Sequence, residues 1–250
     1  MNCIKITFTP KTNIDDHEAI TDLLWDYLGC LYKNGQILKD YLLTQNDDSY
    51  MAFITPSDDD ALDENHNSVY VSEYLTELKN FLDFHTEIIG ENLNTEKICC
   101  CAEKPKWYML YTDWTVEGSP VVCGQCGKSV SLYKLPHILG QQEHYGVLGW
   151  YQAYKNVDSL FLYCLSDRFT YRQMNNPESQ LSKYGRDICK AFEEATGIPF
   201  YYYLFHYQGL HGRRKTPAIC PSCGKDWKLT GKKTFIDYKC DKCRLVADEV

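Results

Sequence analysis

The stretch "CPSCGKDW" (220–227), followed by "CDKC" (240–243), places two cysteine pairs sixteen residues apart. The pattern C-x2-C-x16-C-x2-C falls within the spacing typical of a four-cysteine zinc site. Two residues between paired thiolates let one tight turn direct both sulfurs at one ion, and Gly224 suits such a turn because glycine tolerates positive φ. The predicted zinc ligands are Cys220, Cys223, Cys240 and Cys243.

The segment between these two pairs predicts a hairpin. "DWKLT" (226–230) and "TFIDYKC" (234–240) flank "GKK", and Trp227 and Leu229 alternate with polar Lys228, as one face of a strand requires. A piece of this length buries too little apolar surface to fold alone, and a metal cross-link compensates. We therefore predict a C-terminal zinc ribbon. The alternatives are four unrelated cysteines or two disulfides.

Cysteine usage and the absence of targeting signals predict a compartment that keeps thiols reduced. Thirteen cysteines cannot all pair within one chain, and "MNCIKITFTP" (1–10) lacks a charged-then-apolar leader. No run approaches eighteen apolar residues. We expect a cytoplasmic protein with no membrane association, in which paired cysteines bind metal. Four further thiols in apolar segments are expected in the core: Cys3, Cys30, Cys164 and Cys189.

"CGQCGKSV" (123–130) repeats the cysteine pair and also ends like a phosphate-binding loop. Such a loop needs a glycine five residues before its Gly-Lys-Ser, so that backbone N–H groups can wrap the phosphates. That position is Val122, and Pro120 stiffens the approach. The metal interpretation is therefore favoured over nucleotide binding.

A second metal site needs two more ligands, and "ICCCAE" (98–103) offers them. If this segment is extended, Cys99 and Cys101 point to one face and Cys100 to the other. The predicted ligands of a second zinc ion are Cys99, Cys101, Cys123 and Cys126. Three alternatives stay open: Cys100 as a ligand, His137 as a ligand, and a turn that has lost its metal.

The N-terminal ninety residues show a clear order of elements. A strand at "CIKITF" (3–8) precedes a helix within 15–32, a hairpin formed by 36–44 and 49–55, a second helix near 69–82 and a returning strand at 85–90. The order βαββαβ is the ferredoxin-like arrangement, with two helices on one face of an antiparallel sheet.

The central region alternates helical and strand-like patterns. "SLYKLP" (131–136) is typical of a short strand, and helical spacing follows over 143–163 and 177–197. "IPFYYYLFHY" (198–207) predicts a strand covered on both faces, although a stacking platform for bases is the alternative. The predicted class is α+β, with three parts: a ferredoxin-like domain at 1–92, a cysteine-rich β region with helices at 93–210, and the zinc ribbon at 211–250.

Charge is distributed unevenly along the chain. Residues 211–244 carry ten Lys and Arg against three Asp, a formal +7, whereas the whole chain is −8. A basic ribbon on an acidic body predicts binding to RNA or single-stranded DNA, since the net acidity opposes nonspecific duplex binding. The alternatives are a solvated surface, a tail docked on the acidic body, or an acidic body that binds a basic protein. The predicted nucleic-acid contacts are Arg213, Arg214, Lys215, Lys225, Lys228, Lys232 and Lys233.

No catalytic constellation emerges from the sequence. A four-thiolate zinc ion has no open position for water, so both predicted metals are structural. The histidines lack the H-E-x-x-H spacing of a metalloprotease, and no G-x-S-x-G elbow is present. The sequence therefore predicts a protein that is not an enzyme.

"SPVVCGQCGKSVSLYKLP" (119–136), together with "CPSCGKDW" and "CDKC", resembles the bacterial domain-of-unknown-function family 2310. The resemblance covers most of the chain and is most specific at 119–136 and 220–243. It implies a zinc-ribbon protein with nucleic-acid binding as the expected function, and it supplies no catalytic residues. A protein-binding module of the immunity or antitoxin type is the alternative.

Overall fold

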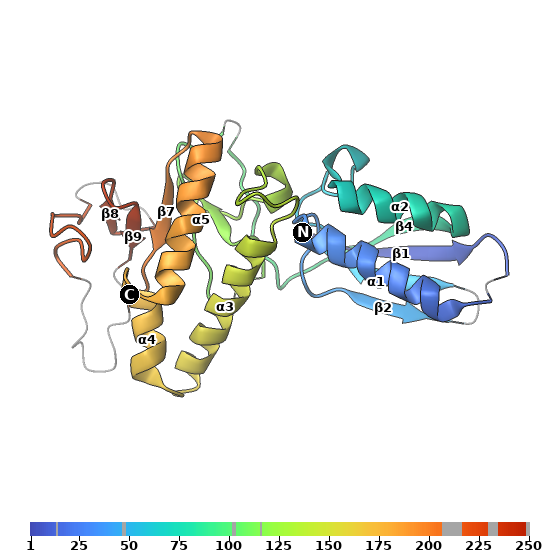
Figure 1. Cartoon of the computed structure of the whole chain (residues 1–250), viewed down its shortest axis with the longest axis horizontal. Coiled ribbons are helices and arrows are strands. Elements are labelled where there is room, and N and C mark those ends of the chain that lie inside the picture. Colours follow the sequence, from blue (N-terminus) through green and yellow to red (C-terminus); the bar gives the residue numbers. More distant parts are fainter. Residues whose placement is uncertain are drawn as a thin grey trace. The chain divides into compact units, whose positions relative to one another are not determined.

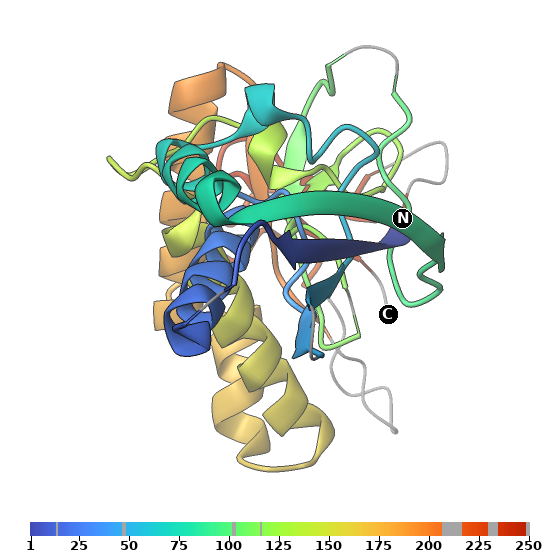
Figure 2. The same cartoon turned by 90° about the vertical axis from the view of Figure 1, so that its right-hand side faces the viewer.

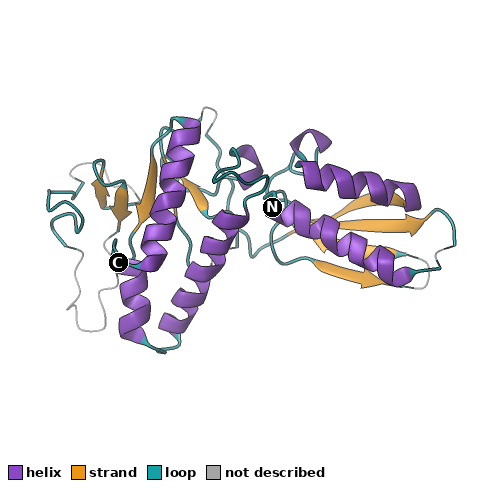
Figure 3. Cartoon of the chain, viewed as in Figure 1, coloured by secondary structure: helices purple, strands orange, loops and turns teal. Residues whose placement is uncertain are grey.

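The computed structural model describes residues 1–13, 15–46, 49–101, 104–115, 117–206, 217–229 and 235–248. The chain divides into two compact units: unit 1 comprises 1–98, 117–119 and 129–145, and unit 2 comprises 99–116, 120–128 and 146–250 (Figure 1). Unit 1 contains a four-stranded sheet and unit 2 a five-stranded sheet, each accompanied by helices (Figure 3). The α+β class predicted from the sequence is confirmed.

Unit 1 is built from an antiparallel sheet with the strand order β2-β3-β1-β4. Helices α1 and α2 lie on one side of this sheet (Figure 2). Each helix starts at a side-chain cap: Asp16 accepts a hydrogen bond from the N–H of Ala19, and Ser68 from the N–H of Val71. Its main elements are β1 (Asn2–Pro10), α1 (His17–Lys33), β2 (Leu42–Gln45), β3 (Tyr50–Ile54), α2 (Val69–Phe81) and β4 (Leu82–Glu91).

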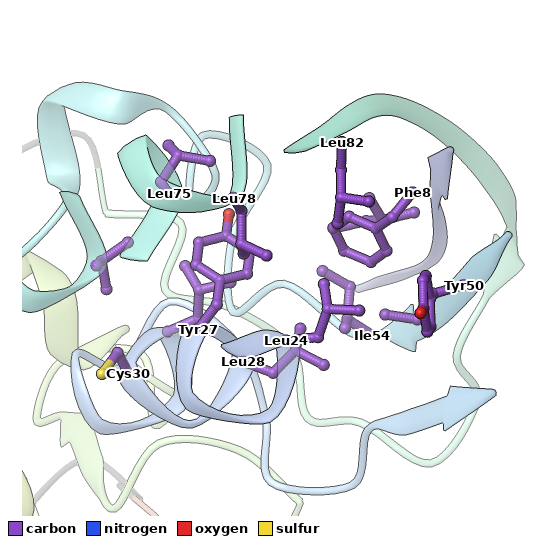
Figure 4. Close-up of a cluster of buried hydrophobic side chains, with 14 of the residues drawn as sticks. Phe8, Leu24, Tyr27, Leu28, Cys30, Tyr50, Ile54, Leu75, Leu78 and Leu82 are labelled. Carbon is purple, nitrogen blue, oxygen red and sulfur yellow. The ribbon is translucent and has the colours of Figure 1, made fainter. Parts of the chain in front are cut away.

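The core of unit 1 lies between the two helices and the sheet (Figure 4). The period-2 alternation of β1 buries Ile6 and Phe8, and α1 adds Leu24 and Leu28 from one face. The ring of Phe8 meets the edge of Phe84 at a centroid distance of 5.0 Å. Full burial of one such side chain stabilises the fold by about 1.5–3 kcal/mol.

The segment 129–145 also belongs to unit 1, and the prediction of a short strand at 131–136 is wrong. Leu132–Lys134 is a 3-10 helix, because the N–H of Leu135 donates to the carbonyl of Leu132 at 2.8 Å and closes a tight turn. The Tyr133 hydroxyl donates to Asp60, and the ammonium group of Lys134 contacts Asp58 and Asp60. These contacts hold the turn on the loop that follows β3.

Unit 2 is organised around a sheet with the strand order β6-β5-β7-β9-β8. The three inner strands are parallel, and each edge strand pairs antiparallel with its neighbour. Its elements are β5 (Tyr108–Leu110), β6 (Val121–Cys123), α3 (Tyr145–Leu162), α4 (Asp167–Asn175), α5 (Gln180–Thr196), β7 (Phe200–Tyr203), β8 (Tyr238–Cys240) and β9 (Leu245–Ala247).

Strand β7 is buried at every position, as its apolar sequence predicts. Phe192 of α5 stacks on Phe200 at 4.9 Å, and Trp150 of α3 meets Tyr202 edge-on at 5.9 Å. The aromatic strand β7 is therefore part of the core of unit 2 and not a stacking platform for bases, because its rings pack against α3 and α5.

Helix α4 was not predicted, because the helices expected at 143–163 and 177–197 leave residues 164–176 unassigned. The chain turns at Cys164 and Ser166, which both have positive φ, and α4 begins directly after this turn. Cys164 is exposed there, so its predicted place in the core is wrong. Cys30 and Cys189 are buried as expected, and Cys3 is half-buried.

Candidate metal centres

The four cysteines near the C-terminus lie together at the end of unit 2. Their Sγ atoms all lie within 4.8 Å of one another, and Cys223 Sγ is 3.7 Å from Cys240 Sγ. No disulfide joins them, since all thirteen cysteines are free thiols. We call this group the ribbon tetrad: Cys220, Cys223, Cys240 and Cys243.

A second group of four thiols forms around strand β6. Cys101 Sγ lies 3.8 Å from Cys123 Sγ, and Cys126 Sγ lies 3.5 Å from Cys99 Sγ. We call it the central tetrad: Cys99, Cys101, Cys123 and Cys126. The structure thus brings together both sets of cysteines that the sequence analysis groups.

The spacing of the sulfurs suits a metal ion. Four thiolates around a tetrahedral zinc ion, each at about 2.3 Å from the metal, lie about 3.8 Å from one another. Three sulfur pairs in the two tetrads are 3.5–3.8 Å apart, and all sulfurs within a tetrad lie within 4.8 Å of one another. Both tetrads could therefore hold a metal ion such as zinc, with four sulfur donors and no open position.

Both tetrads share one turn, encoded by the repeated sequence C-x2-C-G-K. In each, the first cysteine donates its N–H to the lysine carbonyl five residues on, at 2.9 Å from Cys123 and 2.7 Å from Cys220. The glycine N–H returns to the carbonyl of that cysteine at 2.9 Å in both. Gly127 and Gly224 have φ of +69° and +70°, a region where a Cβ is strained.

The turn lowers the pKa of the second cysteine of each pair. Although burial opposes ionisation, the backbone N–H of Lys128 and the neighbouring thiols lower the pKa of Cys126 to about 7. In the ribbon tetrad, the backbone N–H of Lys225 lowers the pKa of Cys223 to about 7. Such N–H···S contacts stabilise the thiolate, which is the form that binds metal.

Five further thiols have a raised pKa: Cys99, Cys101, Cys220, Cys240 and Cys243. The neighbouring thiol of Cys123, with burial, raises the pKa of Cys101 to about 11. Burial raises the pKa of Cys99 far above its ordinary value, and it raises the pKa of the remaining ribbon thiols as well. An ion must therefore displace protons from these sulfurs when it binds.

The two alternative ligands lie outside the tetrads. Cys100 is exposed and accepts a hydrogen bond from the ammonium group of Lys128 at 3.1 Å. His137 belongs to unit 1, where its Nε2 lies 3.0 Å from Oδ1 of Asn34. The alternation expected for an extended C-x-C segment accounts for the exclusion of Cys100.

Both tetrads are attached to edge strands of one sheet. Cys123 is the last residue of β6 at one edge, and Cys240 is the last residue of β8 at the other. An ion in each tetrad would cross-link an edge strand to a neighbouring loop.

Aromatic contacts connect the segment before β5 with the segment before β8. Trp107 lies nearly parallel to Phe235, with centroids 6.1 Å apart, and Phe235 packs against Gly127 of the central turn. The ammonium group of Lys239 lies over the rings of Trp107 and Tyr201. Trp107 was not predicted to lie near the metal centres. The sequence signal for it was its position at the start of the strand-like run "WYMLYTD" (107–113).

Only part of the predicted nucleic-acid surface can be placed. Lys225 and Lys228 are exposed, and Lys228 lies over the ring of Tyr238 at 5.5 Å. Trp227 is buried and donates its indole N–H to the carbonyl of Pro217. The remaining predicted contacts lie outside the described residues: Arg213, Arg214, Lys215, Lys232 and Lys233.

Solved structures similar to this chain include an oxygenase. SnoaB, a cofactor-independent oxygenase from Streptomyces nogalater, matches with 14% identity and a TM-score of 0.30, covering 36% of this chain and 94% of its own. Rv0793 from Mycobacterium tuberculosis matches with 17% identity and the same TM-score, covering 36% and 93%. The expectation that this chain is not an enzyme is contradicted by these neighbours and is not retained. Likenesses this low carry no reaction over to this chain.

In the part of the chain that the structure describes, no helix is both long and apolar enough to cross a bilayer.

Two relatives in sequence cover most of the chain. An uncharacterized protein of Haemophilus influenzae is 30% identical over 257 residues, covering 95% of this chain and 93% of its own length. A second uncharacterized protein of the same organism is 31% identical over 170 residues, covering 65% of this chain and 80% of its own.

Three family models match successive parts of the sequence. Two are domains of unknown function, DUF8589 at residues 1–89 and DUF8594 at 212–249. Between them, the domain of unknown function DUF2310 matches residues 102–205. With this match and the full-length Haemophilus relative, the chain belongs to the domain-of-unknown-function family 2310.

Proposed function

We propose that the chain is a zinc protein in which the central and ribbon tetrads each bind one structural Zn²⁺. The observation that carries this proposal is that the four sulfurs of each group lie within 4.8 Å of one another, with three of the sulfur pairs at 3.5–3.8 Å. The assigned ligands are Cys99, Cys101, Cys123 and Cys126 for one ion, and Cys220, Cys223, Cys240 and Cys243 for the other. Zinc supplies cross-linking here, since four thiolates leave no position for water.

The fold around these sites supports a more specific architecture. We assign unit 1 a ferredoxin-like topology, supported by the element order βαββαβ and the strand order β2-β3-β1-β4. We assign 211–250 to a zinc ribbon, 1–92 to the ferredoxin-like domain, and 93–210 to the region between them. Thirteen free thiols support a cytoplasmic location, where cysteines stay reduced.

The proposed role of the zinc-bearing unit is binding to RNA or single-stranded DNA. Charge supports it: unit 2 has nineteen Lys and Arg against thirteen Asp and Glu, a formal +6. Unit 1 has seven against twenty-one, a formal −14. A basic unit attracts phosphate, while the acidic unit limits nonspecific attachment to duplex.

Titration of the full chain with a labelled single-stranded RNA oligonucleotide tests this role. We expect binding that weakens steeply with salt, by roughly 0.7 log unit in affinity per log unit of salt for each phosphate contact. A variant with Lys225→Glu and Lys228→Glu should bind more weakly and keep its zinc. The matched control changes two exposed lysines of unit 1, Lys11→Glu and Lys39→Glu, and should bind like the wild type.

The acidic surface of unit 1 supports a second candidate, a protein-binding module that covers a basic partner. The formal charge of −14 is the observation that favours it. If neither RNA nor single-stranded DNA binds at low salt, the nucleic-acid role is wrong and this candidate replaces it. The two zinc sites do not depend on that outcome.

A further inference from the structure

A cleft of about 670 Å³ lies in unit 2 between helix α5 and the turn that follows β8. Ligand sites in proteins typically occupy about 300–1,000 Å³, so the cleft has room for a group of nucleotide size. The turn spans Asp241–Arg244 and carries Cys243 of the ribbon tetrad. The second cysteine pair of the ribbon tetrad therefore forms one wall of the cleft.

Cations line both walls of this cleft. On α5, Lys183, Arg186 and Lys190 follow one another at helical spacing, which places them along one face. Lys242 and Arg244 face them from the ribbon turn. Five cationic side chains thus meet around one opening.

Most carboxylates of the cleft are already engaged. Glu193 accepts two hydrogen bonds from Arg244, at 2.7 and 2.8 Å, in a bidentate pair. Asp241 accepts from the Tyr201 hydroxyl at 2.6 Å and pairs with Lys239 at 3.2 Å. Glu194 lies 3.8 Å from Lys190, which leaves Asp187 as the remaining carboxylate of the lining.

The five cations have two different roles. Arg244 is bound to Glu193, a carboxylate of α5, and fixes the ribbon turn on that helix, whereas the other four line the opening. Lys183 and Arg186 share one carboxylate partner, Glu178, at 3.4 and 3.5 Å, and such solvent-facing ion pairs are weak. Arg186 also donates to the Pro177 carbonyl at 3.2 Å. Among the described residues, no carboxylate pairs with Lys242. The cleft therefore offers ammonium and guanidinium groups that a phosphate can recruit.

We propose that this cleft binds the phosphodiester backbone of single-stranded RNA or DNA, with Lys183, Lys190 and Lys242 as its phosphate contacts. The inference rests on the proposed nucleic-acid role and gives that role a location. It also moves part of the predicted contact surface from Lys225 and Lys228 to α5 and the turn at 241–244, because the lysines of both walls line the same opening. Arg244 acts as a positioning residue for the turn.

The test compares two variants of the full chain, each lacking three positive charges of unit 2. The cleft variant carries Lys183→Gln, Lys190→Gln and Lys242→Gln. The control carries Lys104→Gln, Lys106→Gln and Lys155→Gln, which lie outside the cleft lining. Binding of a fluorescein-labelled single-stranded RNA is followed by anisotropy over a range of salt concentrations, and zinc content and melting temperature verify that both variants are folded.

The cleft variant should lose about two units of the log–log salt slope, since each of three lost contacts removes roughly 0.7. At ~0.1 M salt this corresponds to an affinity roughly 100-fold lower. The control should keep the wild-type slope. An unchanged slope in the cleft variant, with normal wild-type binding, overturns the cleft assignment and leaves the proposed function standing. Absence of wild-type binding overturns both.

A competition experiment separates a polynucleotide from a free phosphate group. Adenosine monophosphate and inorganic phosphate are added to the wild-type complex with the labelled RNA. We expect neither to displace the RNA at matched phosphate concentration, because a strand makes several contacts at once. Displacement by adenosine monophosphate at matched concentration would instead assign the cleft to a free nucleotide and overturn the polynucleotide inference.

Discussion

The central and ribbon tetrads have one cysteine pair in the same turn, but their other two cysteines come from different kinds of segment. Each contains the turn C-x2-C-G-K, with the same two backbone hydrogen bonds and nearly the same glycine φ. The ribbon tetrad completes itself with a second C-x2-C pair at the end of β8, whereas the central tetrad uses the C-x-C segment at 99–101, which lies outside any strand or helix. One half is therefore fixed by local sequence, and the other by how the chain around it folds.

This difference predicts that loss of the ribbon turn has the largest effect. Replacing Cys220 and Cys223 with serine should remove one zinc ion and release the segment 217–248 from the sheet, because metal binding contributes roughly 10–16 kcal/mol in isolated zinc-finger peptides. Hydrogen exchange of β8 and β9 measures the effect. Retention of their protection in the variant would show that the ribbon folds without its metal.

Loss of the central turn should have a more local effect. Replacing Cys123 and Cys126 with serine should remove the other zinc ion and expose the edge strand β6, while β7 stays protected because α5 and two strands cover it. Cys100→Ser is the matched control and should keep both ions, since Cys100 lies outside the tetrad. Zinc analysis of the two variants decides the point, and a lost ion in the Cys100 variant would contradict the ligand assignment.

The shared glycine offers a finer comparison. An alanine at Gly127 or Gly224 meets the same left-handed backbone, which costs roughly 1–2 kcal/mol. At Gly127 the added Cβ also comes within 3.2 Å of Phe235, whereas nothing lies within 4 Å at Gly224. Competition with a zinc-binding dye should therefore show a larger loss of affinity for Gly127→Ala than for Gly224→Ala. Equal losses would mean that the contact with Phe235 is absent.

The smallest expected effect is a difference in the pH at which acid releases zinc from the two tetrads. Zinc binds thiolates, so a thiol with a raised pKa holds its proton more tightly and gives up the metal at a higher pH. The pKa of Cys101 is raised to about 11 and that of Cys99 further, beyond the shifts in the ribbon tetrad. As pH falls, the central tetrad should therefore empty first, at the higher pH. Zinc release followed in wild type and in the two double-serine variants checks the order.

Local patterns allowed the cysteine turns and most helices to be predicted. The repeated C-x2-C-G-K turn depends on contacts within six residues, and α5 is marked by its apolar stripe and by Gly197 at its end. Helix α4 was missed because only Thr170 and Met174 of this nine-residue helix are buried, so its sequence carries almost no apolar stripe.

The strand pairings of unit 2 between distant segments could not be predicted. The parallel pairing of β7 with β9 joins residues more than forty positions apart, and no local pattern encodes it. The cleft on α5 depends on the same pairing, since β9 directly follows the turn that carries Lys242. The sequence shows that residues 211–244 are basic, but only the fold shows that α5 lies opposite the turn at 241–244 in the cleft.

The most direct test of this account is the metal content of the intact wild-type chain purified under reducing conditions. Elemental analysis should find two zinc ions per chain. Substitution with cobalt should give the intense visible absorption of two tetrahedral sites with four thiolates each. A count of one would leave the central tetrad as a metal-free turn, and a count of zero would contradict the account of both sites.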